Sequence, residues 1–468
     1  MLGLLAIGLE AYWAQFDGLR PRLLGYLAQV EGRLASSGRV VSAGLVDTPE
    51  KARAAGALFR SEQVDLLLVY TATYATSSQV LPAVQRAGAP ALVLNLQPRA
   101  SLDYEHVTTA EWLAGCSACC VPEICCALER AGISFRVVSG TLAGDDVWEK
   151  IGSWCRAAGA ARAVRDARLG FLGHTYPGML DLYADFTAIH GQLGSHVEVL
   201  EIDDLIARTS SAPEADVARK VAEIRAGFDL AEPAGDPIAA PIEEEDIVHA
   251  ARVAVGLDRL ASDMDLAALA YYYRGLDGNE AERVAASTIV GCSLLTARGI
   301  PCSGEGDLKN AIAMLVMDRL GAGGSFTEFY AMDFDESFVL MGHDGPGHVA
   351  IAGGRPVVRK LKLYHGKHGL GVSVEFKVRL GPVTILGVTQ GRDGRLRLLC
   401  AEGESVPGPT FRIGNTNSRV RFPLPPGDFV TAWSEQGPTH HVALGVGHQA
   451  ATIEKVGHLL GLETVQVA

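Results

Sequence analysis

Five side chains of the types that bind divalent metal ions gather in the last third of the sequence. They are Glu305, Glu328, His343, His440 and His441. The glutamates lie in GEGD and SFTE segments, the first histidine lies in GHDGPGH, and the histidine pair follows GPT. Oxygen and nitrogen donors without a thiolate suit Mn²⁺, Mg²⁺ or Co²⁺ better than structural zinc. The separations form no ligand signature of their own. Taken singly, each histidine is more often a surface or core-capping residue than a ligand, and each glutamate is most often a solvated charge.

The GEGD segment is expected to connect a short strand to a helix. Its glycines permit a sharp turn that leaves the Glu305 carboxylate at the carboxyl edge of a sheet, where binding crevices form. Asp307 has a simpler role as the N-cap of a helix over residues 308–320. The segment around His343 is so rich in glycine and proline that we expect a loop there.

The first third of the chain has the alternating pattern of a parallel α/β sheet. Apolar strands are predicted at 4–9, 40–46, 64–69 and 91–96, and helices at 19–35, 48–62, 78–87 and 145–165. Short buried strands joined through helices imply a parallel sheet covered on both faces. The residues that follow its strands are therefore candidates for binding, and the polar Thr71-Ala-Thr-Tyr segment after the third strand is one such place.

The alternation resumes at residue 168 and then gives way to a different pattern. Further strands are predicted at 168–173, 197–202, 267–273 and 300–302, with helices at 215–226, 241–260, 280–297 and 308–320. Beyond residue 321 the strands become two-periodic, at 372–378, 382–390 and 396–400, before a helix at 448–459 and a strand at 464–467. Such strands indicate an antiparallel, barrel-like domain.

The predicted fold class is therefore α/β, with two doubly wound parallel-sheet domains followed by a β-rich, barrel-like C-terminal domain. The expected domains are an N-terminal α/β domain over 1–166, a central α/β domain over 167–320 that carries Glu305, and a C-terminal domain over 321–468 that carries the remaining metal ligands.

Composition excludes several classes of protein. The 468 residues are 48% hydrophobic, which suffices for several cores and excludes a disordered chain. With 41 basic and 54 acidic residues the net charge is −13, so we expect neither nucleic acid nor an anionic membrane as partner. No apolar run is long enough to span a bilayer. The opening residues lack a basic segment and soon reach Glu10, so we expect no signal peptide and a cytoplasmic location.

Five of the nine cysteines lie between residues 116 and 126. Cys116, Cys119 and Cys120 have a C-x-x-C-C spacing that suits zinc, but no second pair follows at a zinc-ribbon distance. The run continues into a helix predicted over 121–130, so we interpret these thiols as small apolar residues in a reducing compartment.

The sequence segments, taken in order, resemble the L-arabinose isomerases. The resemblance is carried by GEGD at 304–307, GSFTE at 324–328, GH at 342–343, HH at 440–441 and EKIGSW at 149–154. It extends over essentially the whole chain, and the ordered set is far more specific than GEGD alone. It implies a cytoplasmic aldose–ketose isomerase, an intramolecular oxidoreductase of free monosaccharides, that assembles as a homo-oligomer (a trimer, tetramer or hexamer).

The resemblance also implies the metal ligands. In that family the residues matching Glu305, Glu328, His343 and His441 bind a divalent cation, usually Mn²⁺, with Mg²⁺ and Co²⁺ as alternatives here. The related L-fucose isomerases use a Glu, Asp and His set in a similar fold. The nearby acidic residues are therefore an alternative to Glu328 as the source of the second carboxylate ligand. They are Asp333, Asp335 and Glu336.

These residue types suit isomerisation through an enediol. The reaction moves a proton between C1 and C2 of the sugar, and a metal ion stabilises the charge that develops on the adjacent oxygens. Glu305 and Glu328 are the candidate catalytic residues that exchange this proton. The sequence does not indicate which of them removes the proton from C2.

Two segments depart from the family pattern, both at the substrate end of the expected pocket. After the metal histidine the family carries a Glu-Val-Cys-Pro type of stretch, where this chain has Asp344-Gly-Pro-Gly-His348. In the first domain an Asn-Gln-x-x-His-Gly stretch is replaced by the cysteine-rich residues 112–120. We therefore predict a sugar other than L-arabinose.

Four residues are candidates for binding the sugar: Gln15, Met179, Tyr273 and His348. Gln15 and Met179 match family positions, and Tyr273 lies near a pocket aromatic of the family; each is also explained by packing or capping. The alternatives for function are a non-catalytic sugar-binding or sensing protein and an L-fucose isomerase-like enzyme acting on a 6-deoxyhexose. A nucleotide cofactor is not expected, because the sequence has no Walker loop and no G-x-G-x-x-G after its first strand.

Overall fold

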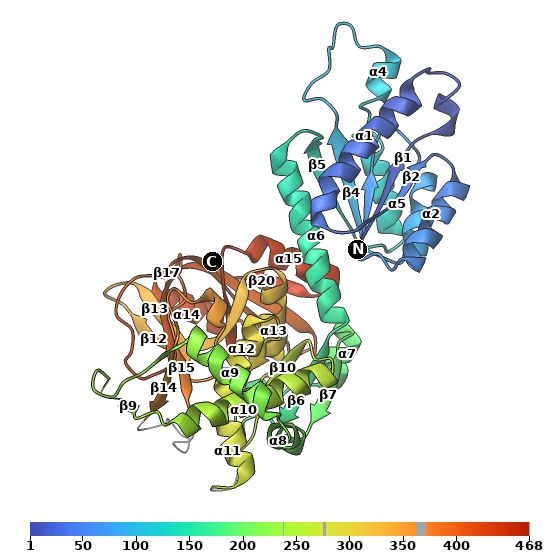
Figure 1. Ribbon diagram of the computed structural model, residues 1–468. Coiled ribbons are helices and arrows are strands. Elements are labelled where there is room, and N and C mark those ends of the chain that lie inside the picture. Colours follow the sequence, from blue (N-terminus) through green and yellow to red (C-terminus); the bar gives the residue numbers. More distant parts are fainter. Residues whose placement is uncertain (237, 275–277, 362–370, 468) are drawn as a thin grey trace. The chain divides into compact units, whose positions relative to one another are not determined.

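The computed structural model describes residues 1–236, 238–274, 278–361 and 371–467. The chain forms two compact units, Met1–Gly159 and Ala160–Ala468, and each is described by itself (Figure 1). The first contains a parallel sheet with helices, and the second contains a parallel sheet followed by an antiparallel barrel, so the predicted α/β class is confirmed.

The first unit is a five-stranded parallel sheet with the strand order β2-β1-β3-β4-β5. The strands are β1 (Leu2–Ile7), β2 (Val40–Val46), β3 (Leu66–Tyr70), β4 (Ala91–Gln97) and β5 (Phe135–Thr141). The helices are α1 (Leu19–Leu34), α2 (Pro49–Ser61), α3 (Leu81–Ala87), α4 (Thr109–Leu113), α5 (Val121–Arg130) and the first part of α6 (Asp145–Arg165). Every residue of β1 and β3 is buried, as expected of central strands covered on both faces.

The second unit begins with a four-stranded parallel sheet in the order β11-β10-β6-β7. Its strands are β6 (Arg168–Gly173), β7 (His196–Leu200), β10 (Ala268–Tyr272) and β11 (Cys302–Ser303). Its helices include α7 (Phe186–Leu193), α8 (Ile202–Ser210), α9 (Glu214–Gly227) and α10 (Glu244–Asp263).

The prediction of a single helix over 280–297 is wrong. Two helices, α11 (Glu280–Ala286) and α12 (Thr288–Ala297), are separated at Ser287. The Ser287 hydroxyl donates to the carbonyl of Arg283 at 2.9 Å, which is the local bonding through which serine competes with a continuing helix.

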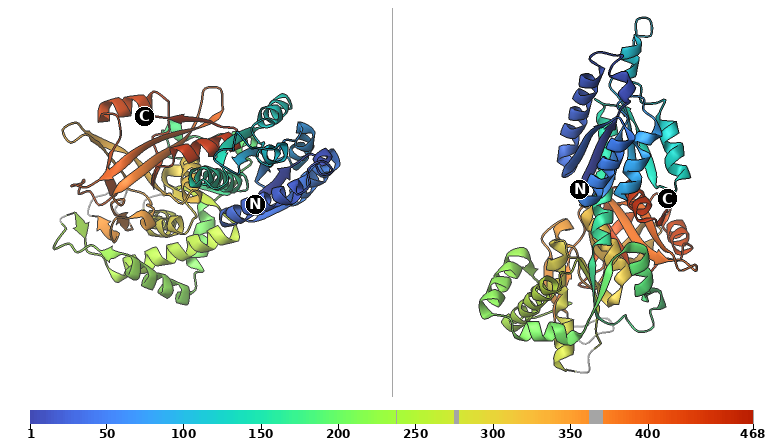
Figure 2. Two further views of the ribbon diagram at one scale, coloured as in Figure 1. Left: turned by 90° about the horizontal axis from the view of Figure 1, so that it is seen from above. Right: turned by 90° about the vertical axis from the view of Figure 1, so that its right-hand side faces the viewer.

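The rest of the second unit contains a closed antiparallel barrel (Figure 2). Its strands follow the order β16-β19-β12-β13-β18-β17, and β16 pairs with β17 to close it. They are β12 (Gly323–Asp333), β13 (Phe338–His343), β16 (Gly381–Gln390), β17 (Leu396–Val406), β18 (Thr416–Arg421) and β19 (Val442–Val446). The short strand β20 (Glu463–Gln466) follows α15 (Ala450–Leu460) and adds in parallel to β17. The predicted barrel-like domain is confirmed.

Helix α13 (Leu308–Arg319) connects the parallel sheet to the barrel. It contacts β10 and β11 on one side and β12, β16 and β19 on the other. Residues 308–317 are all buried, which is the behaviour of a helix with apolar residues on every face. This helix therefore holds the GEGD turn at its start against the barrel strands.

Among the described residues, no helix combines the length and apolar character needed to cross a membrane.

Candidate metal centre

Glu305 projects from a turn that only its small neighbours permit. The turn, η5 (Gly304–Gly306), follows β11 directly, and Glu305 has the left-handed backbone angle φ +58°. A Cβ at Gly304 would lie 2.8 Å from the Phe326 ring, and one at Gly306 would lie 2.5 Å from the carbonyl oxygen of His174. Non-glycine residues rarely adopt this conformation. The turn thus presents one carboxylate between two glycines.

Strand register brings the barrel residues together. Glu328 on β12 pairs with Gly342 on β13, the neighbour of His343. On its other side β12 pairs with β19 through Thr327 and Val442, the neighbours of Glu328 and His441. Glu328 and His343 therefore lie on neighbouring strands, and His441 lies beside them as the residue before β19. The expectation of a loop at His343 is wrong, because this residue is the last of β13 and pairs with Thr416.

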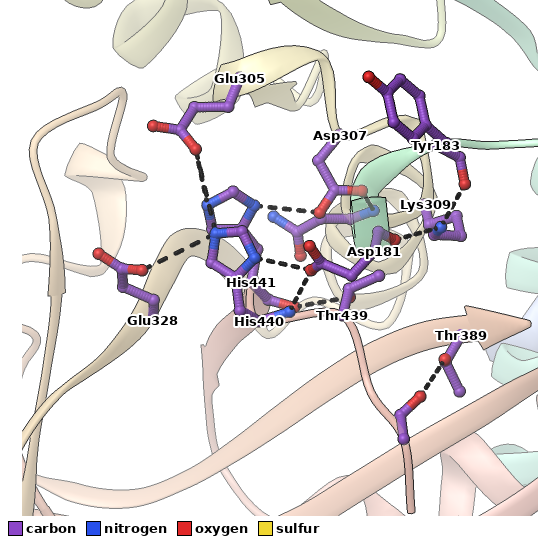
Figure 3. Close-up of polar contacts among 12 residues, drawn as sticks. Asp181, Tyr183, Glu305, Asp307, Lys309, Glu328, Thr389, Thr439, His440 and His441 are labelled. Carbon is purple, nitrogen blue, oxygen red and sulfur yellow. Dashed lines mark hydrogen bonds and ion pairs between the residues drawn. The ribbon is translucent and has the colours of Figure 1, made fainter. Parts of the chain in front are cut away.

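The potential ligand atoms form two overlapping groups. Glu305, His343 and His441 make one group, and Glu328, His440 and His441 make the other, with the ligand atoms of each within 4.8 Å of one another. Figure 3 shows the second group together with Glu305. The Nε2 atoms of His343 and His441 are 3.2 Å apart, and Oε2 of Glu305 is 3.5 Å from Nε2 of His441. The four ligands implied by the sequence resemblance thus meet at His441.

A buried carboxylate supports His441 from behind. Nδ1 of His441 lies 3.1 Å from Oδ2 of Asp307, and both side chains are fully buried (Figure 3). Burial alone lowers the pKa of His441, but the bonds and charges of Asp307 and Glu305 outweigh it and raise the pKa to about 9. A carboxylate on Nδ1 fixes the ring and leaves Nε2 facing the ligand group.

His440 faces the two catalytic candidates from the more exposed end of the centre. Its Nε2 is 4.0 Å from Oε2 of Glu305 and 3.9 Å from Oε2 of Glu328. Asp181 lies behind it: one carboxylate oxygen accepts from the His440 backbone N–H at 3.0 Å and is 2.7 Å from Nδ1. Burial raises the pKa of Asp181, but these bonds and the charge of His440 lower it below its usual range. The side chain of His441 is 0% exposed and that of His440 34%, so the site opens toward His440.

Lys309 anchors the loop that carries Asp181. Its ammonium group donates to the carbonyls of Asp181 at 2.7 Å and Tyr183 at 2.8 Å (Figure 3). Burial lowers the pKa of Lys309, while the charges of Asp307 and Asp181 oppose this effect. The loop after β6 is thus tied to α13, the same helix that Asp307 caps.

The donor set fits a divalent cation. Two imidazole nitrogens and two carboxylates converge, and a third carboxylate holds one imidazole, as is usual around metal ligands. Within the described part of the chain no cysteine belongs to either group. The nitrogen and oxygen donors match Mn²⁺, Mg²⁺ or Co²⁺ rather than structural zinc.

Two family models match the part of the chain that carries the five potential ligand residues. The family model of the L-arabinose isomerase central domain matches residues 184–323, and that of the L-arabinose isomerase C-terminal domain matches residues 323–463. The chain belongs to the L-arabinose isomerase family. It is therefore a member of a family of sugar isomerases.

Individual relatives of this L-arabinose isomerase family member are distant. An L-arabinose isomerase of Nocardioides sp. is 26% identical over 352 residues, which are 72% of this chain and 67% of the relative. A sulfoquinovose isomerase of Alkalicoccus urumqiensis is 24% identical, over 69% of each chain. An L-arabinose isomerase of Aeromonas salmonicida is 24% identical over 87% of this chain and 81% of its own.

The residues expected to bind sugar lie in separate parts of the structure. Gln15 lies in the first unit, exposed, and its amide donates to the carbonyl of Ala11 at 2.9 Å. Met179 is half-buried in the loop that carries Asp181. Tyr273 packs against the apolar core between the sheet and its helices.

Tyr272, the neighbour of Tyr273, is nearer to the candidate metal centre. Its ring is 4.7 Å from that of Tyr176, and Tyr176 donates its backbone N–H to the Glu305 carbonyl. Burial, followed by the charges of Tyr176 and Glu305, raises the pKa of Tyr272 to about 12.

His348 is buried outside both ligand groups. Its Nε2 is 3.7 Å from Asp318 at the end of α13, and its backbone N–H donates to Ser325. The competing acidic group lies at the far end of the β12–β13 hairpin, where Asp333 accepts from the Glu336 N–H and Glu336 pairs with Arg419. Glu328, not this group, is beside the histidines.

Sequence reasoning missed Asp181, Lys309 and Tyr272. Asp181 lies two residues after Met179, which was a candidate, but nothing local to Asp181 indicates a bond to a residue 259 positions later. Asp307 was predicted as a helix cap, and that is confirmed by its bond from the Asn310 N–H at 2.9 Å. Its second role, on His441, was not predicted.

Proposed function

We propose that this chain is a divalent-metal-dependent aldose–ketose isomerase that acts through an enediol. The observation that carries the proposal is the overlap of two donor groups at His441, which brings both catalytic candidates to one place. Family membership supports the reaction class, and the donor chemistry supports the metal.

Glu305, Glu328, His343 and His441 would hold the cation, with Mn²⁺ as the proposed ion. When bound, it supplies Lewis-acid stabilisation of the negative charge that develops on the sugar oxygens. His343 and His441 are almost completely buried, whereas the Glu328 side chain is 31% exposed. The sugar therefore approaches from the side of Glu328 and His440.

Glu305 and Glu328 exchange the proton between C1 and C2. Each has a carboxylate oxygen within about 4 Å of the same imidazole nitrogen, Nε2 of His440. A carboxylate on either side of the reacting carbons can take the proton from one carbon and return it at the other.

His440 orients a sugar hydroxyl and Asp181 positions His440. The carboxylate on Nδ1 fixes the orientation of the ring and leaves Nε2 free to form a hydrogen bond with a sugar hydroxyl. The loop that carries Asp181 is fixed by Lys309, which keeps the dyad in place.

The preferred sugar is proposed to differ from L-arabinose. Two segments at the substrate end depart from the family pattern, and one relative is named a sulfoquinovose isomerase. The test is a panel of L-arabinose, further pentoses and hexoses, L-fucose and sulfoquinovose with the Mn²⁺-loaded enzyme. By far the highest turnover on L-arabinose would contradict altered specificity. Analysis of the product formed in heavy water separates isomerisation from epimerisation.

The alternative function is a non-catalytic sugar receptor, and metal analysis tests it. A receptor needs no metal, so elemental analysis without a divalent ion, together with sugar binding that a chelator leaves unchanged, would favour it. We expect the opposite on both measurements. We also propose a homo-oligomer, which light scattering of the purified protein tests; a monomer active in dilute solution would contradict it.

A further inference from the structure

The first unit contains a pair of thiols that the proposed isomerase reaction does not use. Sγ of Cys116 and Sγ of Cys119 are 2.6 Å apart, in a C-x-x-C segment between α4 and α5. The Cys116 side chain is buried and that of Cys119 is exposed. One sulfur is thus accessible to a reagent, and the other is in contact with it.

The segment that carries the pair is held at the carboxyl edge of the parallel sheet. The hydroxyl of Thr73, just beyond β3, donates to the carbonyl of Leu113 at 2.7 Å. The Cys116 backbone N–H donates to the same Leu113 carbonyl at 3.3 Å, which ties the first cysteine of the pair to this place. The two sulfurs therefore meet in a fixed backbone rather than through a flexible loop.

The other cysteines of the cluster are arranged differently. Cys120 is fully buried at the start of α5, where its thiol donates to the carbonyls of Ser117 at 3.2 Å and Thr73 at 3.8 Å. Cys125 packs against the core of the first unit, and Cys126 is exposed on the helix. Within the described residues, no group with metal-ligating geometry includes any of them. The pair is thus distinguished from its neighbours by contact as well as by spacing.

We propose that Cys116 and Cys119 are a redox-modification site that forms a reversible intramolecular disulfide. The Cys119 thiolate attacks one sulfur of a low-molecular-weight disulfide, which releases one thiol and leaves a mixed disulfide on Cys119. The Cys116 thiolate then attacks the Cys119 sulfur and releases the second thiol. The protein loses two protons and two electrons, and the small disulfide is reduced to two thiols.

The order of attack follows from accessibility. Cys119 is exposed, so a small disulfide reaches its sulfur first. Burial and the hydrogen bond with Cys119 raise the pKa of Cys116 to about 12, so this thiol is poorly suited to react first. It reacts once Cys119 carries a leaving group within reach.

The experiment uses the full chain equilibrated without oxygen in glutathione buffers of increasing oxidised fraction. After acid quenching, the remaining free thiols are alkylated in denaturant. Trypsin releases residues 100–130 as one peptide with five cysteines, since Arg99 and Arg130 bound it and no lysine or arginine lies between. We expect a single transition from five labels to three, with fragmentation placing the three on Cys120, Cys125 and Cys126.

Matched variants identify the pair. Cys125→Ser/Cys126→Ser should keep the loss of two labels, whereas Cys116→Ala and Cys116→Ser should instead retain glutathione on Cys119. Circular dichroism verifies that each variant is folded, and the wild-type measurement stands alone if the buried substitution unfolds the unit. Independent labelling of Cys116 and Cys119 at every ratio, bonding to Cys120, or glutathione that persists on wild-type Cys119 would each overturn the proposal.

Discussion

His441 and Asp307 form a fully buried imidazole–carboxylate pair, with Nδ1 3.1 Å from Oδ2, at the junction between the parallel sheet and the barrel. Asp307 uses its other oxygen to cap α13 through the Asn310 N–H. One carboxylate therefore begins the helix that follows Glu305 and also orients the histidine that joins the two ligand groups.

Replacing this carboxylate by its amide separates the two roles. Asn is as good an N-cap as Asp, so Asp307→Asn should fold normally. Because the substitution removes the negative charge beside Nδ1 of His441, we expect Mn²⁺ affinity to fall by about 10- to 100-fold, measured by isothermal titration calorimetry. Asp307→Ala is the control that loses the cap as well and should cost a further ~1 kcal/mol in unfolding free energy. Unchanged affinity in Asp307→Asn would show that Asp307 only caps the helix.

The stability of the metal-free protein should depend on pH through His441. Its pKa in the folded state is about 9, compared with about 6.5 in an unfolded chain. A raised pKa contributes stability that is fully present below about pH 6.5 and is lost as the pH rises toward 9. We expect the Tm of chelator-treated protein to fall across this window, and to fall less in Asp307→Asn. An equal dependence of Tm on pH in the wild type and in Asp307→Asn would argue against the His441–Asp307 pair as the source of the effect.

The two adjacent histidines should differ in their roles. His441 belongs to both ligand groups and is fully buried, whereas His440 belongs to one and is partly exposed. We expect His441→Ala to weaken Mn²⁺ binding more than His440→Ala does, and His440→Ala to lower turnover while the metal is retained. Calorimetry and turnover at saturating Mn²⁺ measure both effects. The reverse ranking of affinities would mean that His440 is the ligand.

The two glutamates should be essential to turnover. In Glu305→Gln and Glu328→Gln the amide cannot take a proton, so we expect kcat to fall by at least ~10²- to 10⁴-fold. Circular dichroism should show an unchanged fold. As a control, Glu336→Gln alters an acidic residue at the far end of the hairpin and should leave kcat near the wild-type value. Normal activity in either active-site variant would remove that residue from the mechanism.

Asp181 should act on turnover through His440 rather than through the metal. Asp181→Asn removes the charge that fixes the His440 ring. Because a misplaced imidazole no longer orients the sugar hydroxyl, we expect kcat to fall by up to about 10²-fold. Mn²⁺ affinity should stay within twofold of the wild type, and Asp181→Glu should recover part of kcat. A parallel loss of metal and activity would place Asp181 in the metal centre instead.

Much of the fold follows from local patterns. The bounds of β2, β6, α5 and α6 agree with the prediction to the residue, because apolar periodicity and flanking polar residues mark both ends. The barrel strand β17 extends beyond the predicted 396–400 to Val406, since its later residues alternate between buried and exposed positions and include charged side chains. Local hydrophobicity underestimates such a strand.

The site was less predictable because its contacts join distant segments. His343 was expected in a loop owing to its glycines, yet Gly342 is a strand residue whose Cβ would lie 2.5 Å from the Thr416 carbonyl oxygen. Glycine there permits close approach of β18 rather than a turn. The hydrogen bonds that Asp181 accepts from His440 depend on the tertiary arrangement of the loop after β6, which no pattern in either segment specifies.

The most direct test of the central claim is anomalous diffraction from crystals of the full chain grown with Mn²⁺. The account predicts one manganese peak per chain, coordinated by Glu305, Glu328, His343 and His441, with Asp307 in contact with His441 but not with the ion. A peak at another place, or a centre that lacks Glu328 or either of the two histidines, would contradict it.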